Sequence, residues 1–277
     1  MKKTIISCVL FLTAVTAFSQ TPMKTAAEAK LSASDLAVKI ADRILATTTY
    51  EFKNTKTGKT YKSVKNLPLD MNVKVACKYN NWHYTNGVTH IALMELADKM
   101  GAKKYDDYVL KNMNFVFNEG NLDFFKKQYE QAMKNEGWYG VRKLSWHMIF
   151  RGKRLDDNGP MGASLIDLQM KHPNNSFLNY INETAEHLNY GEPRLADGTI
   201  ARIWPHENTI WADDAFMAIS FLARMAKMTG DMSYINDAAN QVIKYHKYLW
   251  CPEKRILYHC YHTDTDEHGV AHWSRAN

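Results

Sequence analysis

The chain has 277 residues, of which 45% are hydrophobic and 12% aromatic, and its formal net charge is +6. This length is enough to bury one large core, so a single domain is the expected organisation. The basic residues are scattered rather than clustered, which argues against nucleic-acid binding and is compatible with a small anionic substrate. Tryptophan and tyrosine pack in cores, but they also form flat platforms on which sugar rings stack.

Residues 1–19 predict a secretory signal peptide. Lys2 and Lys3 form a basic start, an apolar run follows over 5–12, and small residues at 17–19 flank a cleavage point. The apolar run is too short to span a bilayer, and no later stretch is long and apolar enough to do so. We therefore expect an exported chain, periplasmic or extracellular, with a folded region over 20–277 and no membrane-embedded segment.

After the signal peptide, the first recognisable pattern is a helix start. Ser32 and Asp35 form a capping-box-like start, with Asp in place of the usual Glu. Residues 51–80 lack a clear period and predict a long loop or a small ribbon.

A weak internal repeat follows. Apolar helices are predicted over 88–100, 161–171 and 215–228, and each ends near a glycine or proline. An aromatic residue four positions after that breaker opens an amphipathic helix in each case: Tyr105, Phe177 and Tyr234. Helices that are apolar on all sides are buried, and amphipathic helices cover them. Stacked hairpins of an inner and an outer helix indicate an α/α toroid, with a plain helical bundle or solenoid as the alternative.

In a toroid the N-terminal ends of the inner helices converge at one end of the ring. Two of the segments that precede these helices carry side chains that suit either a functional site or an ordinary helix cap or turn. The segment 82–87 contains two aromatic residues, a histidine and an amide, which also fit a helix cap at Thr85 or Asn86 with packing aromatics. In 154–162, Asp156 and Asp157 precede a Gly-Pro turn. Such acids are commonly solvated turn residues, but one carboxylate could lie in a cleft.

The third segment, 202–217, gives the strongest signal. Asp213 and Asp214 stand between Trp211 and a strongly apolar helix. An aspartate at a helix start is usually a cap. A carboxyl group in these surroundings is also desolvated, which raises its pKa towards the range of a general acid.

The C-terminal histidines and the cysteines carry less information. The stretch around Tyr258 alternates like a strand, and the spacing of its histidines, including His259 and His262, matches no zinc signature, so we expect surface histidines and no metal. Cys77, Cys251 and Cys260 remain after the signal, an odd number that allows at most one internal bridge.

Together the motifs resemble the unsaturated glucuronyl and rhamnogalacturonyl hydrolases, glycoside hydrolase families 88 and 105, with the closer match to family 105. The most specific pieces are 155–162, 211–217 and 273–277, and the resemblance covers nearly all of the chain after the signal. It implies an all-α (α/α)6 barrel, a six-hairpin toroid. Because the family continues beyond a motif like that of Trp273 and Arg275 with further helices, we expect the C-terminal part of the toroid to be missing from this chain.

The resemblance also implies an unusual reaction. The family acts on oligosaccharides left by polysaccharide lyases, typically of the pectin type, which end in a 4,5-unsaturated uronic acid. An aspartic acid protonates C4, water attacks C5, and the resulting hemiketal opens and releases the next sugar. The usual retaining or inverting geometry at the anomeric carbon does not apply, and the reaction needs no metal or organic cofactor.

Carried over by motif position, Asp213 is expected to donate the proton and then act as the base for water. Asp157 is expected to be the second carboxylate, and Asp214 to tune the pKa of Asp213. Arg275 is expected near the substrate carboxylate. The remaining candidates wall the subsite or contact the sugar: Trp211, Trp273, His259, Trp82, Tyr84, Asn86 and, with a looser match in spacing, His206.

Two other functions remain open at this point. One is a different carbohydrate-active enzyme on the same toroid, such as an ordinary glycosidase, a lyase or an epimerase, because one fold supports many chemistries. The other is a non-catalytic sugar-binding protein. Activity on saturated substrates would favour the first, and sugar binding without turnover would favour the second.

Overall fold

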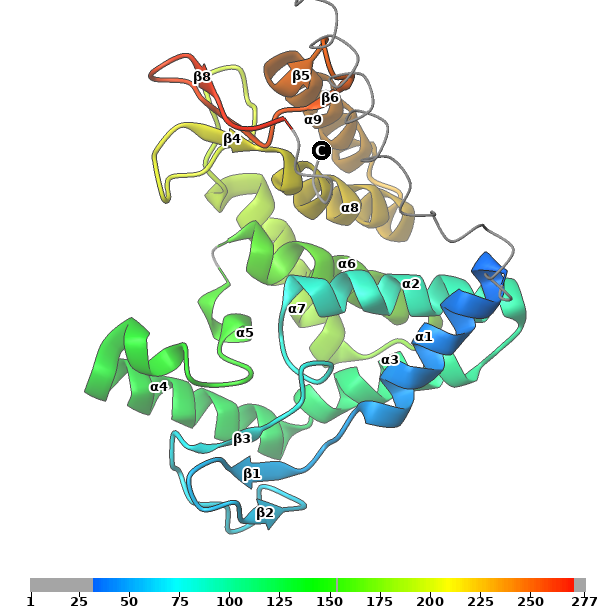
Figure 1. The fold of residues 1–277 in the computed structure, drawn as a ribbon, viewed down its shortest axis with the longest axis vertical. Helices are drawn as coiled ribbons and strands as arrows, with labels where there is room; N and C mark the ends of the chain where they lie inside the picture. The colour runs from blue at the N-terminus through cyan, green and yellow to red at the C-terminus, as the bar shows by residue number, and fades with distance from the viewer. Residues whose placement is uncertain (1–31, 153, 272–277) are drawn as a thin grey trace, which may run out of the picture. The chain divides into compact units, whose positions relative to one another are not determined.

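The computed structural model describes residues 32–152 and 154–271, and helices dominate this part of the chain (Figure 1). The chain divides into two units, Met1–Arg43 and Ile44–Asn277. The first unit is described from Ser32, at the start of α1 (Ala33–Thr47). The predicted capping box is confirmed there, because the Asp35 amide donates to Ser32 Oγ at 3.1 Å and the Ser32 amide donates to Asp35 Oδ2 at 3.1 Å.

The second unit begins with a small antiparallel sheet, which confirms the ribbon alternative for residues 51–80. Its strands are β1 (Phe52–Asn54), β2 (Thr60–Tyr61) and β3 (Val73–Val75), in the order β2-β1-β3. Phe52 pairs with Tyr61 on one side and Val75 on the other. Its side chain is fully buried against Phe124, with ring centroids 5.7 Å apart, so the sheet packs on a later helix, α4 (Glu119–Val141).

Three inner helices lie side by side and run in the same direction (Figure 1). They are α2 (Tyr84–Met100), α6 (Leu155–Lys171) and α8 (Ala212–Thr229). Glycines allow the helices to touch through their backbones near their N-terminal ends. A Cβ on Gly87 would lie 2.3 Å from the carbonyl carbon of Pro160, and one on Gly159 would lie 2.4 Å from the carbonyl oxygen of Met217. Both positions therefore exclude any side chain.

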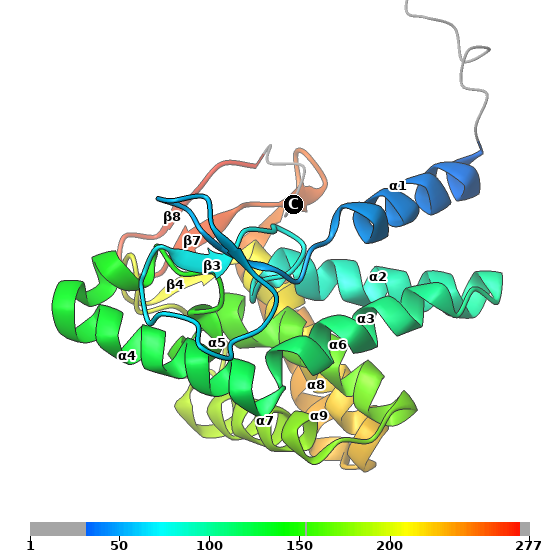
Figure 2. The ribbon, with the colours of Figure 1, turned by 90° about the horizontal axis from the view of Figure 1, so that it is seen from below.

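An outer helix follows each inner helix and packs against it, as Figure 2 shows. These helices are α3 (Lys104–Val116), α7 (Asn175–Glu186) and α9 (Met232–Leu249). The glycines that end α2 and α8 adopt the left-handed conformation, with φ of 61° at Gly101 and 75° at Gly230. The predicted repeat of inner and outer helices is confirmed in this part of the chain.

The inner helices begin earlier than the sequence predicted. Gly159 and Pro160 were expected to form a turn that leads into the helix, with Asp156 and Asp157 before it, but all four residues belong to α6. A proline removes only one backbone donor, and acidic residues such as Asp156 and Asp157 are favoured in a first turn by the helix dipole. The N-cap of α2 was also predicted incorrectly. His83 is the cap, accepting from the Thr85 amide at 3.3 Å, rather than Thr85 or Asn86.

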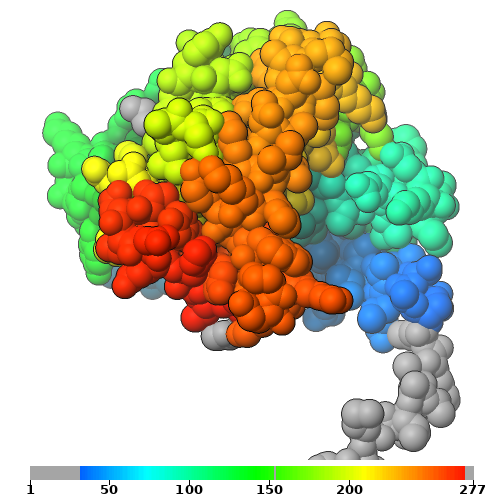
Figure 3. Space-filling model, turned by 90° about the horizontal axis from the view of Figure 1, so that it is seen from above, coloured from blue at the N-terminus to red at the C-terminus, as the bar shows by residue number. Residues whose placement is uncertain are grey.

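Several elements had no counterpart in the sequence prediction. They are α4 (Glu119–Val141), which breaks at Gly137 with φ of 58°, α5 (Met148–Arg151), and a π-helix, η2 (His187–Gly191), that extends α7. The C-terminal region forms a hairpin of β5 (Trp250–Cys251) and β6 (Ile256–Leu257), and a sheet in the order β4-β7-β8. The strands of that sheet are β4 (Thr209–Trp211), β7 (Cys260–His262) and β8 (Glu267–His268). Figure 3 shows this region beside α9.

The three cysteines expected after the signal, Cys77, Cys251 and Cys260, are all free thiols. Within residues 32–152 and 154–271, no helix has the length and apolar character needed to cross a bilayer. The predicted signal peptide over 1–19 lies outside the described residues.

Candidate active site

The N-terminal ends of α6 and α8 bring two of the three predicted segments, 154–162 and 202–217, together around Arg202. The Arg202 amide donates to the Thr209 carbonyl at 2.7 Å, so the chain forms a narrow hairpin ahead of β4. β4 pairs with β7, and Trp211 lies opposite Cys260. These pairings fix the Arg202 side chain beside the first turn of α8, where the guanidinium also lies over the Trp211 ring, 4.7 Å from its centroid.

Arg202 and Asp214 form a buried ion pair with two contacts. Arg202 Nε and Nη2 each donate to one carboxylate oxygen of Asp214 at 2.6 Å. The Asp214 residue is only 1% exposed. Burial raises the pKa of Asp214 to about 7, against the opposing effect of the guanidinium. The pair therefore anchors the start of α8 and gives it a carboxyl group that titrates near neutrality.

Asp213, the predicted proton donor, lies at the edge of this pair. Its Oδ1 is 3.6 Å from Arg202 Nη2, and that oxygen has no hydrogen-bond partner among the described residues. The neighbouring Trp211 meets the buried His259 edge to face, with ring centroids 5.0 Å apart. The expectation of surface histidines is thus wrong for His259. The structure brings together Asp213, Asp214, Trp211 and His259 in one corner of the site.

Asp157 and Asp156 have different environments. The Asp157 side chain is fully buried in a two-contact ion pair with Arg151, and burial raises its pKa while Arg151 acts in the opposite direction. Asp156 is half-buried, and its Oδ2 is 3.8 Å from Arg202 Nη2. Asp156 rather than Asp157 therefore shares Arg202 with Asp213. Successive residues of a helix point about 100° apart, so the helical start at Leu155 allows only one of the two to face Arg202.

A cavity of about 530 Å³ opens beside this cluster. Asp156, Asp214 and Trp204 contribute to its lining, and part of η2 forms the facing wall. Its basic side chains are Arg151, Arg154 and Arg202. Two of these arginines are neutralised by buried carboxylates, whereas Arg154 makes no ion pair with a carboxylate in the described part of the chain. Arg154 lies over the exposed Trp204 ring, 4.6 Å from its centroid.

The other predicted contact residues are more dispersed. Trp82 is 1% exposed, and its Nε1 donates to the Asp157 carbonyl at 2.7 Å, so it supports the first turn of α6. The buried Asn86 amide donates to the carbonyls of Lys78 and Asn81, both at 3.0 Å. These two side chains hold the loop in place, which fits the packing interpretation of the segment.

Tyr84 and His206 are more accessible. Tyr84 is half-buried against the His83 ring, with centroids 4.5 Å apart. His206 is exposed, and its ring centroid is 5.6 Å from that of His262. Trp273 and Arg275 lie outside the described residues, so their roles stay predictions. The described residues contain no group of three or more His, Cys, Asp or Glu side chains that could hold a metal ion.

The sequence model of Glycosyl Hydrolase Family 88 matches residues 56–277. Similar solved structures include a family 105 glycoside hydrolase from C. acetobutylicum ATCC 824, at 20% identity and a TM-score of 0.56, covering 87% of this chain and 55% of that chain. A possible member of family 105 from Klebsiella pneumoniae subsp. pneumoniae MGH 78578 has 12% identity and a TM-score of 0.53, covering 86% and 54%. The GH76A α-1,6-mannanase from Salegentibacter sp. HEL1_6 has 13% identity and a TM-score of 0.51, covering 85% and 57%.

These likenesses show the fold, and the expected toroid of inner and outer helices is confirmed. The chain spans about half the length of the solved structures it matches. A comparison with curated proteins found no match.

Proposed function

The chain belongs to glycosyl hydrolase family 88, and on this premise we propose that it releases a 4,5-unsaturated uronic acid from the non-reducing end of oligosaccharides made by polysaccharide lyases. The bond that reacts first is the C4=C5 double bond. The observation that carries the proposal is an arginine-rich cavity next to carboxylates, because a uronate needs a cation for its carboxylate and an acid for its double bond.

Arg154 is the cation best placed to bind that carboxylate. Arg151 and Arg202 are already paired with Asp157 and Asp214, whereas Arg154 contacts only the Trp204 ring among the side chains described above. A guanidinium binds a carboxylate through two parallel hydrogen bonds. The Trp204 ring beside it offers a flat face for the sugar. Together they form a recognition unit for an acidic sugar.

Asp213 supplies the proton in this proposal. The π electrons of C4=C5 take the proton at C4, and the positive charge that develops at C5 is shared with the ring oxygen. Water then adds at C5 and gives one proton to the Asp213 carboxylate, which restores the acid and leaves a hydroxyl group on C5. The C5 hemiketal opens, and rearrangement releases the neighbouring sugar with its hydroxyl group, so one water is consumed per bond cleaved. Acid–base groups and water are sufficient for this sequence.

Asp213 has support from its neighbours. Its side chain is 25% exposed although Oδ1 is buried and accepts no hydrogen bond from the described residues, so part of the carboxyl group can exchange a proton with solvent. Arg202 holds Asp214 and lies 3.6 Å from Asp213 and 3.8 Å from Asp156. Arg202 thereby sets the positions of three carboxyl groups. Asp156 joins Asp157 as a candidate for the second carboxylate that orients water.

The finer features of the proposal have separate support. Rhamnogalacturonan-type fragments of pectin are proposed as the substrate because the resemblance at 155–162 and 211–217 is closer to rhamnogalacturonyl hydrolases. Export is proposed because residues 1–19 have the pattern of a signal peptide. Both would place the enzyme where lyase products of a plant polysaccharide first become available.

The test follows the absorbance of the conjugated unsaturated uronate with rhamnogalacturonan disaccharides prepared by a lyase. The band should disappear with the wild-type protein and persist with Asp213→Asn, with the loss of rate at least about 100-fold. Exposed Asp123→Asn on α4 is the matched control and should retain activity. An unchanged band across several unsaturated disaccharides, with a protein whose thermal unfolding shows that it is folded, would refute the proposal.

A saturated-chain glycosidase is the second candidate. An inactive variant of the Salegentibacter α-1,6-mannanase has two consecutive aspartates replaced, and this chain also carries consecutive aspartates at 213 and 214. Release of reducing sugar from α-1,6-mannotetraose, without any effect on unsaturated disaccharides, would favour this candidate. The uncommitted Arg154 in the cavity favours an acidic sugar instead.

A further inference from the structure

Most of the chain's excess positive charge lies in one short segment, residues 51–78. It contains seven lysines and two acids, Glu51 and Asp70, and its net charge of +5 compares with +6 for the whole chain. The lysines look scattered along the sequence because no two are adjacent. Five of them recur at every third position from Lys53 to Lys65, with no acid between them. The remainder of the chain is therefore close to neutral.

The fold gathers these lysines on one small sheet. Residues 51–78 form β1, β2 and β3, which lie at the far end of the second unit from β4 (Figure 1). Phe52 is buried, so Lys53 faces outward, because successive side chains of a strand alternate. Lys53 lies directly opposite Lys74 on β3, so two like charges share the outer face. We call the five exposed lysines of β1, β2 and their turns the lysine patch: Lys53, Lys56, Lys59, Lys62 and Lys65.

The charge of the lysine patch is not neutralised by nearby acids. None of its lysines forms an ion pair with a carboxylate among the residues that the structure describes. Asp70, the acid inside the segment, accepts from the Asn54 side chain at 3.0 Å and the Asn72 side chain at 2.8 Å. Lys56 adds only a smaller attraction to the Asn72 hydrogen bonds that lower the pKa of Asp70.

Protection of the sheet edge explains only part of this pattern. Lysines on edge strands prevent pairing with other chains, which suits Lys59 and Lys62 beside the edge strand β2. Lys53 lies on the central strand, and like charges directly opposite each other, as at Lys53 and Lys74, destabilise a sheet. An acid-free series of lysines that lowers stability in this way indicates a surface for an anionic partner.

We propose that the lysine patch binds an acidic polysaccharide, a polyuronate with a carboxylate on each ring, and holds the enzyme on the polymer from which its substrate is made. The choice of a polyuronate among polyanions rests on the proposed function. Charge complementarity supplies the attraction. The described lining of the arginine-lined cavity includes none of the five lysines, so this surface is distinct from the candidate active site.

The composition of the surface favours carboxylates over a nucleic acid. Residues 44–141 contain no arginine, the residue whose planar fork pairs best with phosphates and bases. Nucleic-acid surfaces also offer aromatic rings that stack on bases. The ring beside the patch, Tyr61, is half-buried, and Lys59 Nζ already lies 5.1 Å from its centroid.

The experiment measures binding of polygalacturonate to the full chain by calorimetry, with dextran as the neutral polymer. Polygalacturonate should bind, more weakly as salt rises because exposed charges are screened, and dextran should not. The triple variant Lys53→Gln, Lys56→Gln, Lys62→Gln should bind about tenfold more weakly, since each exposed ion pair contributes about a factor of two.

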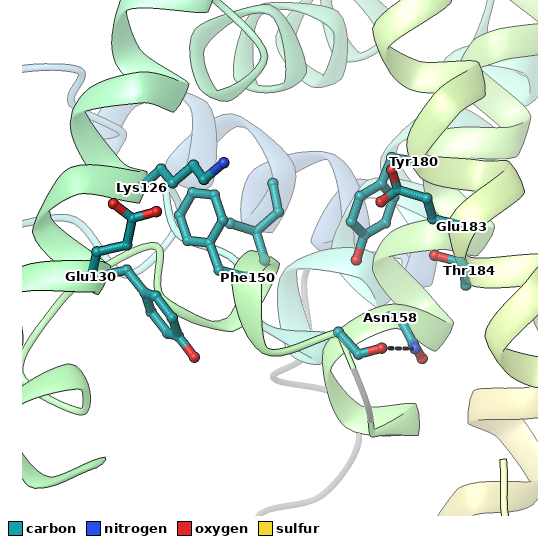
Figure 4. Close-up of a pocket in the computed structure, with 10 residues that line it drawn as sticks. Lys126, Glu130, Phe150, Asn158, Tyr180, Glu183 and Thr184 are labelled. Atoms are coloured by element: carbon teal, nitrogen blue, oxygen red, sulfur yellow. Dashed lines mark hydrogen bonds between the residues drawn. The ribbon is translucent and has the colours of Figure 1, made fainter. Parts of the chain in front are cut away.

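The matched control changes the net charge equally with Lys126→Gln, Lys227→Gln and Lys254→Gln, all exposed positions outside the patch. Lys126 lies with Glu130 at a cavity between α4 and α7 (Figure 4). This variant should bind within about twofold of the wild type.

Turnover of an unsaturated disaccharide is measured alongside and should be equal in the wild type and the patch variant. A wild type that binds polygalacturonate without turnover would refute the proposed reaction and leave the binding surface standing. Absence of polygalacturonate binding, or an equal effect of the two triple variants, would overturn the proposal. Binding of an oligonucleotide or of anionic vesicles in place of polygalacturonate would overturn it as well, because the patch would then serve another class of partner.

Discussion

Replacing Arg202 with methionine should destabilise the protein severely, because it leaves the Asp214 carboxylate buried without its partner. Asp214 is 1% exposed and both of its oxygens accept from Arg202 at 2.6 Å, while the Arg202 side chain is 19% exposed. Breaking a buried pair by removing one partner costs about 3–5 kcal/mol. The double variant Arg202→Met with Asp214→Leu should lose less than Arg202→Met alone, since no buried charge remains.

Urea unfolding at pH 8, above the pKa of Asp214, followed by circular dichroism, gives these free energies of unfolding. Arg224→Met is the control, because the Arg224–Asp167 pair has a similar distance of 2.8 Å but side chains that are 21% and 23% exposed. It should cost about 1 kcal/mol or less. The role of the pair would be refuted if Arg202→Met lowered the free energy of unfolding by less than about 1 kcal/mol. It would also be refuted if the loss in the double variant equalled the sum of the losses in Arg202→Met and Asp214→Leu.

Three further outcomes are expected. In steady-state kinetics, Arg154→Ala should raise KM for an unsaturated uronate about 10- to 100-fold with little change in kcat, because the substrate carboxylate loses a charged hydrogen-bonding partner. A lower kcat at constant KM would contradict this role. Burial raises the pKa of Asp214 to about 7. Between about pH 4 and 7 this carboxyl group is therefore protonated in the folded protein and ionised in the unfolded chain. The free energy of unfolding should therefore fall as pH rises through that window, by up to about 4 kcal/mol, and Asp214→Asn should flatten the slope. Gly159→Ala should cost about 1–3 kcal/mol in urea unfolding, because its Cβ would meet the Met217 carbonyl oxygen at 2.4 Å. Gly120→Ala is the control and should cost less, because the nearest atom to its Cβ would be the end of the Val64 side chain, at 3.3 Å.

Local signals in the sequence predicted the helical repeat well. The capping pair Ser32 and Asp35 and the terminal glycines Gly101 and Gly230 act within one turn of the helix they delimit, so the sequence alone identifies them. α4 begins at a cap, because the Asn118 side chain accepts from the Asn121 amide, but its residues lack a clear apolar period. Its position depends on distant residues, as in the hydrogen bonds from Gln128 to the Asp70 and Val73 carbonyls.

The candidate site was predictable in its composition but not in its pairing. Asp213 and Trp211 were identified because two carboxylates stand between a tryptophan and an apolar helix, whereas Asp157 was assigned through the family resemblance. The assignment of partners depends on where α6 begins, which decides that Asp157 turns towards Arg151 and Asp156 towards Arg202. Arg154 could not be identified as a substrate-binding residue from its local sequence. Its role is inferred because the other two arginines of the cavity, Arg151 and Arg202, are paired with carboxylates.

The bare backbone contacts at Gly87 and Gly159 have a mechanical consequence for the carboxylates just ahead of them. Main chains in van der Waals contact cannot be compressed further, so these crossings act as fixed pivots between α2, α6 and α8. Repacking at the far ends of the helices can swing those ends apart, yet the short arms that carry Asp156 and Asp213 would move only slightly. The end that carries the candidate site can thus keep its spacing while sequence varies over the rest of the helices.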